Sequence, residues 1–235
     1  MAMWTTYWRP RRRSSVRGNG TRRQPAGLLA PAVAAFLCLF VAPLDTQARD
    51  TPVDLELIIA VDVSGSIDAE EAQLQRDGYV SAFTDPEVIG AITRGMLGRI
   101  AITYIEWAGI HHSKTVVDWT LIDGEDSAKA FAANVAKAPL ETALWTSISR
   151  AIAYALPKFD GNGFEGTRRV IDISGDGPNN WGDLVTLARD RAVNQGITIN
   201  GLPILDQSTG PFSRYNIPNL DLYYRDCVIG GPAAF

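Results

Sequence analysis

The sequence predicts an α/β fold, in which a doubly wound, mainly parallel central sheet is covered by helices on both faces. Beyond about residue 50, apolar segments of strand length alternate with longer segments of helical periodicity, which is the pattern of consecutive strand–helix units. The first strand, "DLELIIAV" at residues 54–61, is apolar almost throughout, as a strand buried on both faces must be. With 46% hydrophobic residues among 235, the chain can fill one large core.

The elements can be assigned in order along the chain. The first helix is expected at residues 68–85, with Asp68 as its cap and acids in its first turn. Strands at 99–108 and 114–122 are joined by the short "GIHHS", which predicts an antiparallel hairpin. The remaining elements are helices at 124–138, 146–159 and 181–196, and strands at 167–174 and 197–205.

The last part of the chain is short for such a fold. After Leu205 we expect only a loop and a helical turn near residues 220–224 before Phe235. A doubly wound domain would add a last strand and a closing C-terminal helix there. The fold is therefore expected to lack both, either because the domain is small or because the chain is cut short.

Residues 1–48 have the features of a secretory signal peptide, and residues 49–235 are expected to form one domain. Residues 1–48 hold seven arginines and one acid, Asp45; all seven arginines precede the apolar stretch 26–42, and Thr46 and Ala48 supply small residues before a cut. This order predicts export to the periplasm or the extracellular space, with the twin-arginine route as a weak option. An uncleaved membrane anchor is the alternative, but Pro31 and the short apolar length fit a spanning helix poorly.

The remainder of the chain is acidic, with 15 Lys and Arg against 25 Asp and Glu. Nucleic acid is therefore excluded as a partner, because phosphate contacts need clustered bases. Once the signal is removed, Cys227 is the single cysteine, so no disulfide can form within the mature chain.

Oxygen-bearing side chains gather where the predicted strands end. Asp62, Ser64 and Ser66 follow the first strand, Thr146 opens a helix, and Asp176 follows the fourth strand. Ligands of open parallel sheets collect outside the carboxyl ends of the strands, at the switch point in strand order. Two carboxylates and three hydroxyls form a hard, all-oxygen set suited to Mg²⁺, with Mn²⁺ or Ca²⁺ as alternatives, and poor for zinc.

In this order, the five residues resemble the metal-ion-dependent adhesion site of von Willebrand factor A domains. The first strand, "TSISRAI" and "VIDISGDGPNN" are most similar to a bacterial branch of exported, uncharacterised members, and the resemblance covers residues 53–235. It implies that Ser64 and Ser66 bind the metal directly and that Thr146 binds it directly or through water. Asp62 and Asp176 would act mostly through water.

The expected function is that of an exported adhesion-type domain rather than an enzyme. Because hydroxyls dominate the site, the charge of the ion stays under-neutralised, and an open position favours an Asp or Glu carboxylate of a protein partner. Two features depart from the family pattern. Bulky Leu144 and Trp145 precede Thr146 where the family has glycines, which leaves Thr142 as a second candidate, and the missing closing helix argues against an affinity switch.

Two other functions stay open. "GDGPNN" also resembles the acidic fourth motif of haloacid-dehalogenase-like phosphatases, with Asp62 as the nucleophile, but Ser64 stands where that chemistry needs a second acid. A metal-free interaction scaffold is the other alternative, since "DVSGS" alone also suits a capped turn.

Several further side chains have competing interpretations. His111 and His112 are adjacent in a hairpin loop, so we interpret them as loop surface rather than metal ligands. Glu106 and Trp107 either contribute to a partner-facing rim or pack in a turn. Asp172, inside an apolar strand, is expected to be a buried carboxylate satisfied by neighbouring backbone donors.

Overall fold

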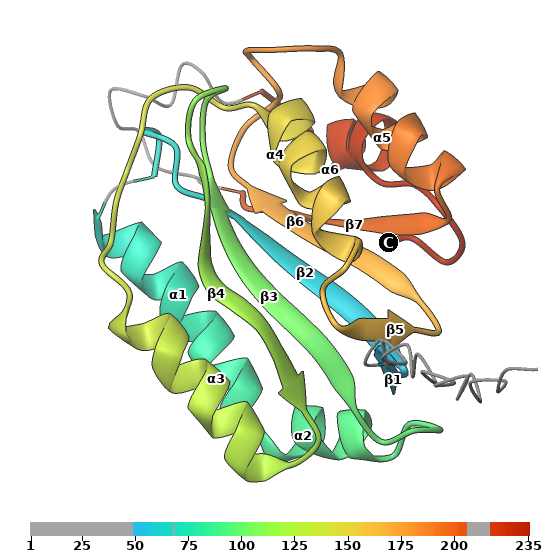
Figure 1. Cartoon of the computed structure of the whole chain (residues 1–235). Helices are drawn as coiled ribbons and strands as arrows, with labels where there is room; N and C mark the ends of the chain where they lie inside the picture. The colour runs from blue at the N-terminus through green and yellow to red at the C-terminus, as the bar shows by residue number, and fades with distance from the viewer. Residues whose placement is uncertain (1–48, 68, 206–216) are drawn as a thin grey trace, which may run out of the picture. The chain divides into compact units, whose positions relative to one another are not determined.

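A five-stranded sheet forms the middle layer of the structure (Figure 1). The computed structural model describes residues 49–67, 69–205 and 217–235, so the predicted signal peptide and the predicted cap Asp68 lie outside the described residues. The strand order is β4–β3–β2–β6–β7, with all neighbours parallel except β4, which runs antiparallel to β3 as the hairpin prediction requires. The strands are β2 (Leu55–Asp62), β3 (Ile100–Trp107), β4 (Ser113–Ile122), β6 (Arg169–Gly175) and β7 (Ile197–Pro203).

Helices cover both faces of this sheet, which confirms the predicted doubly wound α/β arrangement (Figure 1). One face is covered by α1 (Ala69–Thr84), α2 (Pro86–Thr93) and α3 (Glu125–Lys137). The other face is covered by α4 (Ile148–Ala155), the turn η1 (Leu156–Phe159), α5 (Val185–Asn194), α6 (Leu220–Tyr223) and the π-helical turn η3 (Tyr224–Val228).

The sheet separates two hydrophobic cores, and β2 contributes to both. Ile58 and Ala60 pack in the core with α4 and α5, whereas Ile59 and Val61 pack in the core with α1 and α3. Successive side chains of a strand point to opposite faces, so a strand covered on both sides must be apolar at every position. This explains the unbroken apolar run that marked the first strand in the sequence.

Three short elements were not expected from the sequence. Helix α2 begins at Pro86, and its cap Asp85 accepts a hydrogen bond at Oδ1 from the amide of Glu87, at 2.6 Å. Strands β1 (Thr51–Val53) and β5 (Phe164–Gly166) pair in parallel as a separate two-stranded sheet. Segments of three residues are too short to show a periodicity.

The last residues of the chain cover the outer edge of β7. Ile199 and Gly230 exchange two backbone hydrogen bonds, of 2.8 and 3.1 Å, and the amide of Gly201 donates to the carbonyl of Phe235 at 2.9 Å. The central sheet of the described residues therefore has five strands, and its exposed edge is β4. Within the same residues, no helix is long and apolar enough to cross a membrane.

Candidate metal-binding site

Three loops meet at the carboxyl end of the sheet. Strands β2 and β6 are neighbours, with Val61 opposite Ser174, so the loops that follow them emerge side by side. The loop before α4 is tied to them, because the amide of Ala143 donates to the carbonyl of Val63 at 3.0 Å. Ala143 also forms an isolated parallel bridge with Ser64. This is the switch point at which α/β sheets bind ligands.

Hydrogen bonds connect four of the five predicted site residues. The amide of Ser64 donates to Asp62 Oδ1 at 2.8 Å, and the hydroxyls of Ser64 and Ser66 lie 3.1 Å apart. The Ser66 hydroxyl in turn donates to Asp176 Oδ1 at 2.9 Å, across 110 residues of sequence. Asp62, Ser64 and Asp176 are buried, so oxygen atoms from two loops gather in a partly enclosed place.

Thr146 lies at the same end of the sheet, next to the turn that carries Asp176. Its hydroxyl oxygen is 3.9 Å from the position that a Cβ at Gly177 would occupy. Its amide donates to Asn180 Oδ1, and its carbonyl accepts from the amide of Asn180, both at 2.9 Å. Thr146 is buried, whereas Thr142 is exposed earlier in the loop, so Thr146 is the better placed of the two candidate threonines.

The electrostatics of the site fit a cation. Burial, reinforced by the nearby charge of Asp176, raises the pKa of Asp62 well above its ordinary value. Asp62 Oδ2 is buried without a hydrogen-bond partner among the described residues. A buried oxygen left unpaired beside a second carboxylate is costly, and a divalent cation would relieve both penalties. The residues present therefore fit a hard divalent ion held by carboxylates and hydroxyls.

Tyr224 is a neighbour of the site that sequence reasoning missed. Its hydroxyl oxygen and Asp62 Oδ2 lie 2.7 and 2.9 Å from the position that a Cβ at Gly175 would occupy, so only glycine fits there. The Tyr224 hydroxyl is also buried without a partner in the described structure. Burial, followed by the charges of Asp62 and Asp176, raises the pKa of Tyr224, which keeps the phenol protonated. No spacing in the sequence links this last helical turn to the first strand.

The other candidates are placed elsewhere or have structural roles. Glu106 and Trp107 are buried, so the partner-facing interpretation was wrong, and Glu106 forms an ion pair with Arg76. Asp172 accepts a hydrogen bond from the side-chain amide of Asn200 at 2.7 Å, rather than from the expected backbone donors. Among the described residues, no group of three or more His, Cys, Asp or Glu side chains could hold a metal ion.

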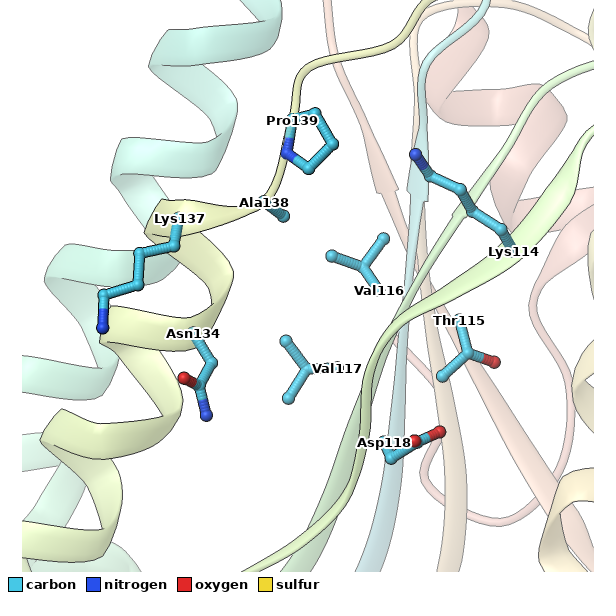
Figure 2. A pocket seen from close by; sticks show the side chains of 9 residues that line it. All are labelled: Lys114, Thr115, Val116, Val117, Asp118, Asn134, Lys137, Ala138 and Pro139. Carbon is cyan, nitrogen blue, oxygen red and sulfur yellow. The ribbon is translucent and has the colours of Figure 1, made fainter.

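Two hollows differ in their relation to these ligands. The larger, with a volume of about 490 Å³, lies between β4 and the C-terminal end of α3, where Val116 and Lys137 are among its lining residues (Figure 2). It contains none of the five predicted ligands. A smaller hollow of about 270 Å³ is lined by Asp176 and by Ile67 and Leu74, so it adjoins the candidate metal site.

Comparisons with known proteins are consistent with this fold. Residues 52–235 match the model of a family described as "Protein of unknown function (DUF1194)", and a search of curated proteins found no match. Among solved structures, the proximal thread matrix protein 1 of the mussel byssus is similar, with a TM-score of 0.51 and 15% identity over 66% of this chain. This chain spans 38% of that protein's length.

Two further solved structures show likeness at low identity. One is the same mussel protein with a zinc-occupied MIDAS motif, with a TM-score of 0.50 and 15% identity over 66% of this chain and 39% of that chain. The other is the protein BatB from Bacteroides thetaiotaomicron, with a TM-score of 0.46 and 21% identity over 75% of this chain and 78% of that chain. The fold is von Willebrand factor A-like, as the sequence resemblance implied.

Proposed function

The chain belongs to the DUF1194 family and has a von Willebrand factor A-like fold, and from its site we propose that it is a divalent-cation-dependent protein-binding domain of the adhesion type. Asp62, Ser64, Ser66, Thr146 and Asp176 would hold the ion. When bound, the divalent cation supplies a coordination position for a carboxylate oxygen. The partner would therefore be a protein that offers an Asp or Glu side chain.

One observation carries this proposal: hydrogen bonds run from Asp176 through the two serines to Asp62, and Asp62 Oδ2 is buried without a hydrogen-bond partner among the described residues. A capped turn alone would not need Asp176, which comes from a different strand. The zinc-occupied MIDAS motif of the mussel protein supports a divalent ion in general. The hydroxyl-rich ligand set favours Mg²⁺ or Mn²⁺ here.

The phosphatase alternative is less well supported. Asp62 is fully buried, and its Oδ1 already accepts a hydrogen bond from the amide of Ser64. A nucleophilic carboxylate needs access to the phosphorus atom and an acid nearby to protonate the leaving group. Ser64 stands in the place of that acid. We propose that the chain acts by binding and that it is exported, as its first 48 residues predict.

Titration of the purified chain with Mn²⁺ tests the metal site directly, because free Mn²⁺ can be followed by its paramagnetic resonance signal. We expect one saturable site, and about 10- to 100-fold weaker binding in Asp176→Ala. Asp172→Asn is the matched control, since it removes a carboxylate from β6, the strand that precedes Asp176, and its partner Asn200 is not a site residue. Absence of saturable binding by the folded wild type would contradict the proposal, as would equal binding by Asp176→Ala.

A further inference from the structure

An exposed aromatic surface borders the candidate metal site, and we propose that it selects the partner. Leu144, Trp145 and Trp181, here called the indole rim, would take a large apolar or aromatic side chain that neighbours the partner's metal-bound carboxylate. The partner is then a protein segment in which Asp or Glu adjoins such a residue. This inference rests on the proposed function and adds the chemistry of the residue beside the carboxylate.

The three side chains of the rim are exposed. The exposed fractions are 73% for Leu144, 57% for Trp145 and 39% for Trp181. The two indole rings lie 5.7 Å apart at an angle of 59°. Elsewhere in the described residues, Trp107 is fully buried and Trp119 packs against a core, so the exposed tryptophans occur together at this one place. Contiguous exposed apolar surface of this kind marks interaction sites.

The rim is attached to the predicted metal ligands themselves. Trp145 directly precedes Thr146, and the amide of Trp181 donates to the carbonyl of Thr146 at 3.2 Å. On the other side, Leu144 Cδ2 lies 3.4 Å from the position of a Cβ at Gly65, between the two site serines. A partner whose carboxylate reaches the ion would therefore place its neighbouring side chain against these indoles.

The backbone holds this surface at an energetic cost. Trp145 has φ = 72°, a left-handed conformation that is unfavourable for a residue with a Cβ. Beneath it, a Cβ at Gly109 would lie 3.1 Å from Trp145 Cβ and 3.2 Å from Trp181 Cε3. Glycine at this position lets both indoles pack close to the backbone. The rim is thus preorganised, which lowers the entropic cost of binding.

The shape of the rim favours a side chain over a sugar. Two indoles tilted by 59° form a wedge rather than a flat platform on which a sugar ring could stack. The ring of His111 meets Trp181 edge-on at 5.7 Å and adds a third aromatic ring to this group. Such a group of rings suits a Phe, Trp or Leu side chain, because it offers apolar surface to all three and edge-to-face contact to the two aromatic ones.

An array of short peptides of the form Ser-Gly-Asp-Z-Gly-Ser, with Z as Trp, Phe, Leu, Ser or Lys, tests the inference. The probe is the full-length chain in Mg²⁺ or EDTA, beside the same peptides with Asn in place of Asp. We expect binding that needs both Asp and Mg²⁺, and at least about tenfold tighter binding with Z as Trp or Phe than with Ser, as for aromatic anchors at interfaces. Equal binding of all Asp peptides would overturn the inference and leave the proposed function intact.

Variants separate the rim from the metal site. Trp145→Asn removes the indole and places a residue that tolerates positive φ, so the loop is not further strained. This variant and Trp181→Ala should lose the preference for aromatic Z but keep Mn²⁺ binding and the need for Asp. The controls are Met96→Ala, a 96% exposed residue after α2, and Leu74→Ala, in the hollow beside Asp176; both should keep the preference.

Three results would overturn the inference. The first is an aromatic preference that survives in both indole variants, and the second is one that disappears in Leu74→Ala instead. The third is Mg²⁺-dependent binding of polygalacturonate that needs Trp145 while no peptide binds, because the rim would then serve an acidic polysaccharide. If no ligand binds in a Mg²⁺-dependent way, the proposed function fails together with the inference.

Discussion

At the scale of single residues, Gly109 is a position where space alone decides the identity of the side chain. A Cβ there would lie 2.6 Å from the carbonyl oxygen of Leu144, a backbone atom that cannot turn aside. We expect Gly109→Ala to lower the free energy of unfolding by about 1 to 3 kcal/mol, as overpacking does. It should also weaken Mn²⁺ binding, because the adjacent Ala108 carbonyl accepts the amide of Ser147 and so anchors the loop of Thr146.

Urea denaturation measures this effect, and Gly78→Ala is its control. Gly78 lies inside α1 with no atom within 4 Å of its would-be Cβ, so alanine there should stabilise the chain by about 0.5 to 1 kcal/mol. Similar effects of both substitutions, with unchanged Mn²⁺ binding, would show that the loop before α4 can shift freely.

Asp172 provides a pH-dependent test at the same scale. Burial raises its pKa above the ordinary value of 3.8, and the hydrogen bond from Asn200 lowers it only in part. Because the folded chain then holds this proton more tightly than the unfolded chain, the ionised carboxylate destabilises the fold at neutral pH. The penalty disappears as the pH falls below 3.8.

Asp172→Asn keeps an acceptor for Asn200 and removes the charge. We expect a higher free energy of unfolding than in the wild type at pH 7, and a difference that shrinks steadily towards pH 4. Denaturation curves between pH 4 and 8 measure it. A difference that does not change with pH would mean that the amide acts through packing and not through the missing charge.

At the scale of elements, a buried ion pair holds α1 against the sheet. Arg76 of α1 and Glu106 of β3 are 2% and 1% exposed, and Arg76 also donates to the backbone carbonyls of Ala138 and Pro139 after α3. Removal of one partner leaves the other charge buried. We expect Arg76→Met to cost about 3 kcal/mol, the lower end for such pairs, because Lys114 lies 3.4 Å from Glu106.

The double variant Arg76→Met with Glu106→Gln should recover much of this loss, since it leaves no unpaired charge. Thermal unfolding of both variants checks the prediction. Lys129→Ala, which breaks an exposed pair with Glu125 on α3, should have no measurable effect. An equal loss in the single and double variants would assign the effect to the contacts of Arg76 with the backbone carbonyls.

The same scale shows how far the sequence could predict the fold. All five strands of the central sheet were predicted, most clearly β2 and β3, because a strand that is covered on both faces is apolar at nearly every position. Helix α5 begins at Val185, four residues after its expected start. The reason is local: Asn180 and Trp181 are hydrogen-bonded to Thr146, which holds the segment as a loop. Such contacts between distant loops leave no periodicity.

Some residues of the candidate site could be predicted from the sequence, and others could not. Asp62, Ser64 and Ser66 could be found because alternate residues after a strand face one place, and Asp176 because it directly follows a neighbouring strand. Trp181 and Tyr224 could not, since each reaches the site only through the path of a loop or a last helical turn. Sequence patterns report local repetition, whereas these two residues depend on the packed fold.

At the scale of the whole molecule, the residues that would bind the metal ion lower the stability of the ion-free fold. Without an ion, burial of Asp62 close to Asp176 opposes folding, as the raised pKa of Asp62 indicates. An ion that binds only the folded chain adds stability in proportion to the logarithm of its concentration. We therefore expect divalent ions to change the stability of the fold mainly through Asp62.

Asp62→Asn should reverse the order of stability between two conditions. In EDTA the variant should melt at a higher temperature than the wild type, because it removes a buried charge and keeps an oxygen to accept the Ser64 amide. In Mg²⁺ at about 100 times its dissociation constant, the wild type should gain about 2.7 kcal/mol and the variant almost nothing. Asp172→Asn serves as the control, since its melting temperature should differ from that of the wild type by the same amount in EDTA and in Mg²⁺, once the gain of the wild-type site from Mg²⁺, which this variant shares, is included. A wild type whose melting temperature ignores saturating Mg²⁺ would contradict the coupling. A variant less stable than the wild type in EDTA would instead show that the Asp62 charge stabilises the loops without any ion.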